Sequence, residues 1–482
     1  MPERKRVAVL ADSDTRWKWG ALTARRLVPD HQLTGFLLRG RATPTARQLG
    51  EVGVRADRLS EVTCAEFLAE IERERYDVVV LALVGGAVQA VLHGARALWP
   101  APARRPVLVT GYVGVVYEKL ADGLLLRHGA DLVLANSRHD AQRFRAVYEG
   151  VGADAATVTE TALPFLGGAP YEPVGSRAHT VVFAVQPSVP DSRADRAYLL
   201  ERAAGHARRH PDREVLIKLR SKPGEHTTHL EEQPYQRLAE KVPGGLPPNC
   251  RLVYGNMGEV LDGTDLLVTV SSTAALESLH RSIPTAILTD LGIREALGNH
   301  HFLGSGCLAS WDQLDSGLLP TGDPIWLAAQ GVLPAPGPDR GTDGAAANRP
   351  TGHLTDGATG HLTDGATGHL TDGAAGRATD GAAGADAYAV ARAKVAGLLA
   401  ATRLPSPAPY YTRTTAPGYL PGILARHHLA PDGTPLPGAA RPAAGESRLR
   451  RRLRGHLREA ARGAYRHGVQ RVAPVIRRLG EL

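Results

Sequence analysis

The sequence predicts an α/β fold made of two doubly wound, Rossmann-like domains that face a cleft. Short apolar strands alternate with helix-like stretches along the first 165 residues, and the alternation resumes after a Pro- and Gly-rich break at 164–175. The expected strands are near-continuous runs of Val and Leu, which is typical of parallel strands that are covered by helices on both faces. A length of 482 residues accommodates two such domains and additional segments.

The first domain is expected over residues 1–165 and the second over residues 176–333. Strands of the first are expected at 6–11, 33–38, 77–84, 106–110, 131–135 and 157–163, with helix-like stretches at 21–27, 65–75, 87–99, 118–128 and 138–148. Strands of the second are expected at 179–185, 214–219, 251–254, 265–270 and 285–289. Because ligands of open α/β sheets bind beyond the carboxyl ends of the strands, the loops that follow these strands are the places to look for a site.

The most informative of these loops is a hydroxyl-rich turn, Ser271, Ser272 and Thr273, which lies between an apolar strand and a helix. The first N–H groups of a helix have no partner inside it and the helix dipole favours negative charge, so the turn is a candidate phosphate site. Glu277 lies one helical turn later, where its carboxylate could accept bonds from a ribose. A turn that only caps the helix is the alternative, but the ordered set of strand, turn, Glu277 and Pro284 favours a nucleotide site.

This arrangement resembles the nucleotide-sugar domain of GT-B glycosyltransferases, through Val268–Val270, Ser271–Thr273, Glu277–Leu279 and Pro284–Ile287. The wider chain, at roughly 5–330 and 385–482, resembles an actinobacterial family of uncharacterised proteins labelled glycosyltransferases, especially at 10–20 and 217–226. The resemblance implies a GT-B fold, a nucleotide-sugar as substrate rather than a cofactor, and a late helix that packs back across the cleft.

The loop expected after the first strand, residues 12–20, holds two carboxylates and two indoles. Asp14 or Asp12 is a candidate general base for an acceptor hydroxyl, while Trp17 and Trp19 are candidates to stack on an acceptor sugar. An Asp helix cap and tryptophans that cover the edge of the core are the alternative, and for the tryptophans this second interpretation is favoured. Glu118, after the fourth strand, is a further catalytic candidate or else a first-turn helix carboxylate.

The loop after the strand at 214–219 is basic. Lys218, Arg220 and Lys222 alternate, so an extended backbone would place them on one face, where a diphosphate is a natural counter-charge. The loop is similar to the Lys-x-His-Pro element of GT-B enzymes that transfer sialic acid or polyol phosphate, with Lys-Pro in place of His-Pro, which leaves the donor open. His226 and His229 have a spacing that a metal could use, but no third ligand is evident, and no metal is expected. His300 and His301, between glycines, are candidates for donor contact or for a simple loop turn.

Composition narrows the function class. Three widely spaced cysteines predict neither a disulfide framework nor a zinc motif, and fit a cytoplasmic protein. Neither a signal peptide nor a membrane-spanning apolar run is expected. The absence of Gly-x-Gly-x-x-Gly after the first strand and of a P-loop argues against a dehydrogenase and a kinase.

Residues 334–385 are expected to be a low-complexity linker, since an octapeptide that begins at Thr351, Thr359 and Thr367 has one Leu per copy and cannot build a core. Residues 386–446 are expected to hold a late helix and a Pro/Gly-rich extension. Residues 447–482 are a basic tail with eleven arginines and two glutamates. The net positive charge of this tail is therefore larger than the net charge of +8 of the whole chain. Its Leu spacing predicts an amphipathic helix for an anionic membrane surface, and nucleic acid is not an expected partner.

The sequence therefore predicts a cytoplasmic enzyme, peripheral on the inner face of the cell membrane through its tail. It would transfer a sugar from a nucleotide-activated donor to a cell-envelope glycan or a lipid-linked acceptor. A sugar-nucleotide epimerase or polyol-phosphate transferase on the same fold is the alternative enzyme. A membrane-recruited protein that binds a nucleotide or glycan without turnover is the alternative outside catalysis.

Overall fold

The computed structural model describes residues 4–115, 120–173, 175–222, 225, 231, 233–332 and 386–437. The described residues of both sheets and of the extension after them belong to one compact unit. The expected linker at 334–385, the tail at 447–482, Glu118, His226 and His229 lie outside the described residues. No described helix is long and apolar enough to cross a lipid bilayer.

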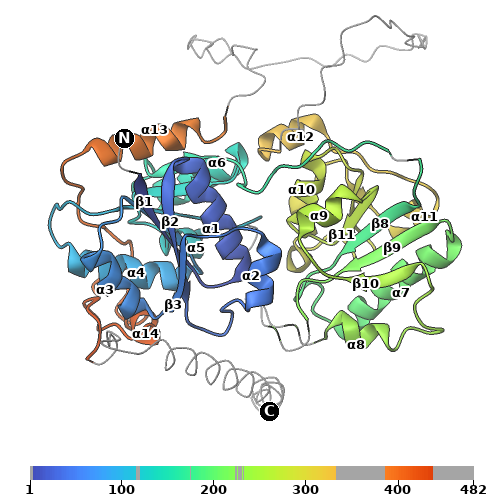
Figure 1. Ribbon diagram of the computed structural model, residues 1–482, viewed down its shortest axis with the longest axis horizontal. Helices are drawn as coiled ribbons and strands as arrows, with labels where there is room; N and C mark the ends of the chain where they lie inside the picture. The colour runs from blue at the N-terminus through green and yellow to red at the C-terminus, as the bar shows by residue number, and fades with distance from the viewer. Residues whose placement is uncertain are drawn as a thin grey trace, which may run out of the picture. The chain divides into compact units, whose positions relative to one another are not determined.

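The first sheet has seven parallel strands in the order β3-β2-β1-β4-β5-β6-β7 (Figure 1). Their bounds are β1 (Lys5–Ala11), β2 (His31–Leu38), β3 (Arg58–Val62), β4 (Val78–Ala82), β5 (Val107–Gly111), β6 (Leu132–Ala135) and β7 (Val158–Glu160). The helices between them are α1 (Asp14–Leu27), α2 (Ala46–Val52), α3 (Cys64–Arg73), α4 (Gly85–Leu98), α5 (Leu120–Leu125) and α6 (Arg138–Gly150).

Alternate residues of the central strands enter two separate hydrophobic cores. In β1, Ala8 and Leu10 belong to one core, whereas Val7 and Val9 belong to the other. This division follows from the two-residue period of a strand and explains why the strand reads as continuously apolar. The sheet is therefore covered on both faces, as expected for a doubly wound domain.

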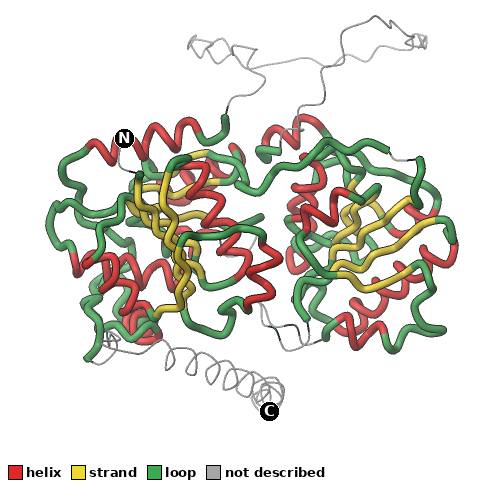
Figure 2. Tube along the Cα trace, in the orientation of Figure 1, coloured by secondary structure: helices red, strands yellow, loops and turns green. Residues whose placement is uncertain are grey.

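The second sheet has six parallel strands in the order β10-β9-β8-β11-β12-β13. Figure 2 shows the strands of both sheets in yellow and the helices beside them in red. Its strands are β8 (His179–Ala184), β9 (Arg213–Lys218), β10 (Cys250–Val253), β11 (Leu266–Thr269), β12 (Thr285–Leu288) and β13 (Leu308–Ala309). Its helices are α7 (Arg193–Arg209), α8 (Tyr235–Ala239), α9 (Met257–Asp262), α10 (Ala274–His280), α11 (Trp311–Asp315) and α12 (Pro324–Ala329), with 3-10 turns at Glu295–Leu297 and Asn299–Phe302.

Both sheets have the strand order that creates a topological switch point. In the first sheet, β2 follows β1 on one side of the β1–β4 pair, and β5 follows β4 on the other side. In the second sheet, β9 and β12 lie on opposite sides of the β8–β11 pair in the same way. Crevices for ligands form beyond the carboxyl ends of such strand pairs. Two Rossmann-like sheets in succession are the architecture that the sequence predicts, and the predicted break at 164–175 lies in the connection from β7 to β8.

The segment after the gap returns to the first sheet. Helix α13 (Ala389–Ala400) contacts α1, β5 and β7, and Tyr388, Ala391 and Val395 enter one core of that sheet. The Tyr388 hydroxyl donates to the carbonyl of Ala162 at 2.8 Å. Helix α14 (Leu420–Arg426) packs on α4 and buries Leu420 and Leu424 in the other core. The late helix therefore packs back onto the first domain.

Candidate functional site

A cavity of about 350 Å³ lies beyond the carboxyl ends of strands from both sheets. Residues that line it follow β1, β8, β9, β10 and β11, and others come from α2 and from the connection between the sheets. Both switch-point regions therefore open into one cavity, which is the two-domain arrangement that the sequence predicts. Seven of the predicted site residues line this cavity: Asp14, Lys218, Arg220, Ser271, Ser272, Thr273 and Glu277.

The segment after β1 differs from the expected loop. Ser13 caps α1 by accepting from the backbone N–H of Arg16, and the helix begins at Asp14. Trp17 is 1% exposed and Trp19 is 0% exposed, so neither ring has a face open to a sugar. The Trp17 indole N–H donates to the carbonyl of Val54 at 3.2 Å. This burial removes the two tryptophans as candidates for acceptor binding and confirms the favoured alternative, in which they pack in the core.

Asp12 also has a structural position. Its carboxylate accepts from the backbone N–H of Val84 at 2.9 Å and from the Arg16 guanidinium at 3.0 Å. It joins the ends of β1 and β4 and does not line the cavity. Of the two aspartates proposed as general base, Asp14 is therefore the one that the cavity contains.

Three other predicted donor contacts lie away from the cavity. Lys222 is exposed, and its ammonium lies 5.5 Å from the centroid of the Tyr254 ring. His301 lines a separate void of about 10 Å³ with Asn136 and Asp140, and burial lowers the pKa of its imidazole to about 4. His300 precedes it in the same 3-10 turn and is absent from the residues that line the larger cavity. The structure thus does not bring these three side chains to the candidate donor site.

Two ion pairs cross the cavity from one domain to the other. The Lys18 ammonium, on α1, lies 3.3 Å from the carboxylate of Glu277, on α10. The Arg220 guanidinium, after β9, lies 2.6 Å from the carboxylate of Asp14, on α1. Each cation of these pairs is already positioned in the cavity and is balanced by a carboxylate of the opposite domain.

Burial changes the charge behaviour of these groups. It raises the pKa of the Glu277 carboxyl, which is 8% exposed, and the nearby Lys18 offsets this only in part. Burial also acts to raise the pKa of Asp14, but the Arg220 charge and the hydrogen bonds from Arg220 and Thr15 outweigh it and hold that pKa below its usual value. Asp14 is therefore ionised at neutral pH.

Lys218 is the most deeply buried cation of the cavity. It is 6% exposed, and its ammonium donates to the carbonyl of Leu219 at 2.8 Å. Burial lowers the pKa of this ammonium to about 8. A buried lysine with a lowered pKa binds an anion strongly, because an anion restores the stability of its charged form.

The hydroxyl-rich turn is held in place by neighbouring polar groups. The side-chain oxygen of Gln186 accepts from the backbone N–H of Ser271 at 3.0 Å, and the Ser271 hydroxyl donates to the carbonyl of Leu297 at 2.6 Å. The Ser272 hydroxyl accepts from the backbone N–H of Ala274 at 3.2 Å, so it also caps the start of α10. The turn therefore combines a capping role with a place on the cavity wall.

Thr273 closely approaches the first domain. A Cβ at Gly114 would lie 2.6 Å from the Thr273 hydroxyl oxygen, so a side chain at Gly114 would collide with it. The Gly that follows β5 thus allows the hydroxyl-rich turn to come close to the other domain. A larger residue at this position would force the Thr273 side chain to shift.

Sequence reasoning missed several cavity residues: Lys18, Gln48, Glu51, Gln186 and Asn256. For Lys18 a signal was present, because it lies four residues after Asp14 and therefore on the same helical face. Gln186 and Asn256 directly follow predicted strands, where site residues are expected. Gln48 and Glu51 come from α2, a seven-residue helix with no pronounced apolar pattern.

A family model described as "Putative glycosyltransferase (DUF6716)" matches residues 7–345. No curated protein matches the sequence.

Similar solved structures include the UDP-GlcNAc 2-epimerase from Neisseria meningitidis bound to UDP-GlcNAc, with 9% identity and a TM-score of 0.43, over 68% of this chain and 95% of that one. The S. aureus MnaA–UDP co-structure has 12% identity and a TM-score of 0.44, over 68% and 91%. A UDP-glucosyltransferase from Polygonum tinctorium has 12% identity and a TM-score of 0.41, over 68% and 88%.

Proposed function

The chain belongs to the family described as "Putative glycosyltransferase (DUF6716)", and from this membership and the cavity we propose that it transfers a sugar from a nucleotide-activated donor to a hydroxyl acceptor. The observation that carries the proposal is the lining of the cavity. Lys218 and Arg220 bring positive charge to the wall that also holds the hydroxyl-rich turn, and Asp14 and Lys18 face this wall from α1 of the first domain.

In this proposal the second domain binds the donor. The phosphates lie between the basic side chains of Lys218 and Arg220 and the hydroxyls of Ser272 and Thr273, and Glu277 accepts from the ribose. Charge-assisted hydrogen bonds to phosphate are roughly twice as strong as neutral ones. Since these cations supply the charge that a divalent ion provides in other transferases, we propose a transfer that requires neither a metal nor a cofactor.

Chemistry would follow from the same contacts. The bond between the anomeric carbon and the phosphate oxygen breaks, and the acceptor oxygen forms a new bond to that carbon. Negative charge grows on the leaving phosphate, so fixed donors aimed at it lower the barrier. The acceptor hydroxyl passes its proton to Asp14, which is freed when the donor phosphates take over Arg220.

The hydroxyl-rich turn gives a binding test. Replacing Ser272 and Thr273 together by Ala should weaken nucleotide binding, because each lost hydrogen bond to a charged phosphate costs about 1.5–3 kcal/mol. Loss of the helix cap alone should cost about 1 kcal/mol of folding stability. Titration calorimetry with UDP, GDP, dTDP and CMP measures the first effect, and thermal melting measures the second.

Ser278→Ala is the matched control for this test. Ser278 lies on the same helix and its buried hydroxyl contacts the Thr285 hydroxyl at 2.8 Å, but it does not line the cavity. We expect this control to lower the melting temperature and leave nucleotide affinity unchanged. If the double variant behaves in the same way, the turn only caps the helix.

For the acceptor, we propose a cell-envelope glycan or a lipid-linked precursor reached at the inner face of the cell membrane. The basis is the Arg-rich sequence of residues 447–482, in which Leu449, Leu453 and Leu457 recur at helical spacing. Each basic residue near an anionic leaflet adds about 1 kcal/mol at low salt.

Co-sedimentation with vesicles tests this membrane proposal. The intact protein should bind anionic vesicles in a salt-sensitive manner, whereas a protein truncated after residue 446 should not. Neutral vesicles should retain neither protein. Equal binding of the intact and shortened proteins to anionic vesicles would show that the tail is not the anchor.

A further inference from the structure

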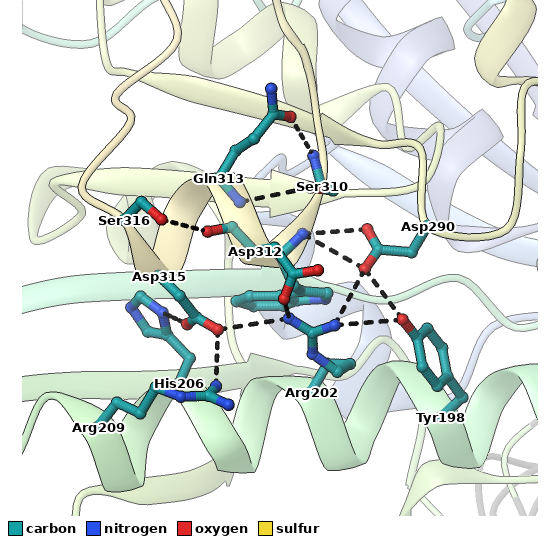
Figure 3. Close-up of polar contacts among 11 residues, drawn as sticks. Tyr198, Arg202, His206, Arg209, Asp290, Ser310, Asp312, Gln313, Asp315 and Ser316 are labelled. Atoms are coloured by element: carbon teal, nitrogen blue, oxygen red, sulfur yellow. Dashed lines mark hydrogen bonds and ion pairs between the residues drawn. The ribbon is translucent and has the colours of Figure 1, made fainter.

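A second polar cluster lies in the second domain, apart from the cavity. It joins the end of α7 to α11, close to Arg213, where β9 begins, whereas the cavity lies beyond the other end of that strand. Figure 3 shows Arg202, His206 and Arg209 extending from α7 towards Asp315 on α11. None of these residues lines the nucleotide cavity.

Within this cluster, His206, His210 and Asp315 bring three metal-ligating groups together. One ligand atom from each residue lies within 4.8 Å of the other two. His206 Nδ1 is 2.7 Å from Asp315 Oδ1, and the two imidazole rings have centroids 4.5 Å apart. The histidines are four residues apart at the end of one helix, which places them on the same face.

The histidines have the surroundings of ligands rather than of surface side chains. His206 is fully buried, and His210 Nε2 is buried without a hydrogen-bond partner among the described residues. A buried polar atom without a partner is costly, and a bound ion is one way in which proteins satisfy it. Metal bonds of about 2.0–2.2 Å place tetrahedral ligand atoms roughly 3.4 Å apart. The 2.7 Å between His206 Nδ1 and Asp315 Oδ1 must therefore lengthen, while ligand atoms that lie farther apart, within 4.8 Å, must draw closer around an ion.

We propose that His206, His210 and Asp315 bind a divalent transition-metal ion of the zinc type. Two imidazoles and one carboxylate favour Zn²⁺ or Co²⁺ over Mg²⁺ and Ca²⁺, which prefer oxygen ligands. The hydrogen of the neutral His206 imidazole moves from Nδ1 to Nε2, and the ion bonds to the freed Nδ1, to Asp315 and to His210. Water completes the fourth position.

The surrounding charges permit this exchange. Asp315 Oδ2 also pairs with Arg209 at 2.7 Å and with Arg202 at 3.3 Å. Arg209 is 58% exposed at its side chain and can turn into solvent, while Arg202 keeps Asp312 at 2.6 Å. Arg213 donates to the other nitrogen of His206 at 3.3 Å, so its side chain must turn away when that nitrogen takes the hydrogen. Asp290 and Asp312 add negative charge beside the cluster.

The proposed ion has a structural role. It would join α11 to α7 through residues that do not line the cavity. The ion would therefore supply no charge to the transfer reaction. A ligand that binds only the folded state stabilises it in proportion to the logarithm of its concentration over its Kd. Occupancy should therefore appear as a higher melting temperature, independent of any nucleotide.

The test uses the full-length protein after treatment with a chelator. Zn²⁺ and Co²⁺ are titrated while thermal melting and, for Co²⁺, visible absorption are recorded. Zn²⁺ should raise the melting temperature of the wild type, Mg²⁺ should not, and Co²⁺ should give the absorption bands of a tetrahedral site. His210→Ala should weaken the apparent metal affinity by at least about tenfold, as even lost outer partners of a ligand do.

His139→Ala is the control, because His139 is also a half-buried histidine on a helix, but it lies on α6 of the first domain. It should retain the wild-type response. His210→Gln keeps a polar side chain of similar length and replaces His210→Ala if that protein does not fold. An equal melting shift in the wild type and the His210 variant, an equal shift with Mg²⁺, or no shift with Zn²⁺ would each overturn the proposal.

Discussion

Replacing Asp14 by Asn should lower the turnover number of sugar transfer by about 10²–10⁴, the usual contribution of a positioned general base. The substitution keeps the size of the side chain and removes its ability to take the acceptor proton. It also removes the partner of Arg220, which pairs with Asp14 at 2.6 Å. Donor affinity should therefore stay unchanged or increase while turnover falls, and steady-state kinetics together with titration calorimetry separate the two quantities.

Asp12→Asn is the matched control for this variant. Asp12 lies two residues earlier, holds Val84 and Arg16, and does not line the cavity. We expect it to reduce folding stability with little effect on turnover. A similar loss of turnover in both variants, or an Asp14→Asn enzyme within a few fold of the wild type, would remove Asp14 from the role of base.

Replacing Lys218 by Met should weaken the binding of a nucleoside diphosphate by about 1.5–3 kcal/mol, or roughly 10- to 150-fold in Kd. Met preserves the length of the apolar stem, so the loss reports on the ammonium. Lys222→Met is the control from the same loop, because Lys222 is exposed and does not line the cavity. Equal affinities of the two variants would place the phosphates elsewhere.

The pH dependence of binding gives a second readout for Lys218. Its pKa is lowered to about 8, so the free protein carries this charge at pH 7 and loses it as pH rises through 8. A bound phosphate favours the charged form and raises that pKa in the complex. The Kd of the wild type should then rise above pH 8, by up to about tenfold per pH unit. The Lys218→Met variant should lack this rise.

The central strands of both sheets could be predicted from sequence because burial on both faces leaves a continuous apolar signature. β3 (Arg58–Val62) was missed for the converse reason: it is an edge strand whose first three residues are exposed and polar or isolated. β13 was missed because it has only two residues. The length and burial of a strand thus decided whether it could be predicted from its sequence pattern.

At the site, most of the predicted residues that line the cavity lie at or just after a strand end, such as Lys218 and Ser271. The pairing of Lys18 with Glu277 joins residues 259 positions apart, and no local pattern specifies such a contact. The start of α1 was predicted too late, because the helix begins after Ser13 and not at residue 21, so Trp17 and Trp19 lie on a helix and not in a loop. Long-range contacts and helix starts therefore account for most of the differences between the predicted site and the site in the structure.

The central claim is that the cavity transfers a sugar from a nucleotide-activated donor. The most direct measurement is nucleotide release from UDP-, GDP-, dTDP- and CMP-sugars, in the presence of a membrane fraction that carries lipid-linked glycans. We predict release from one donor class, dependent on that fraction and lost in Asp14→Asn. Donor binding without release would contradict transfer and indicate a binding protein, whereas an isomerised sugar-nucleotide without net release would contradict it in favour of an epimerase.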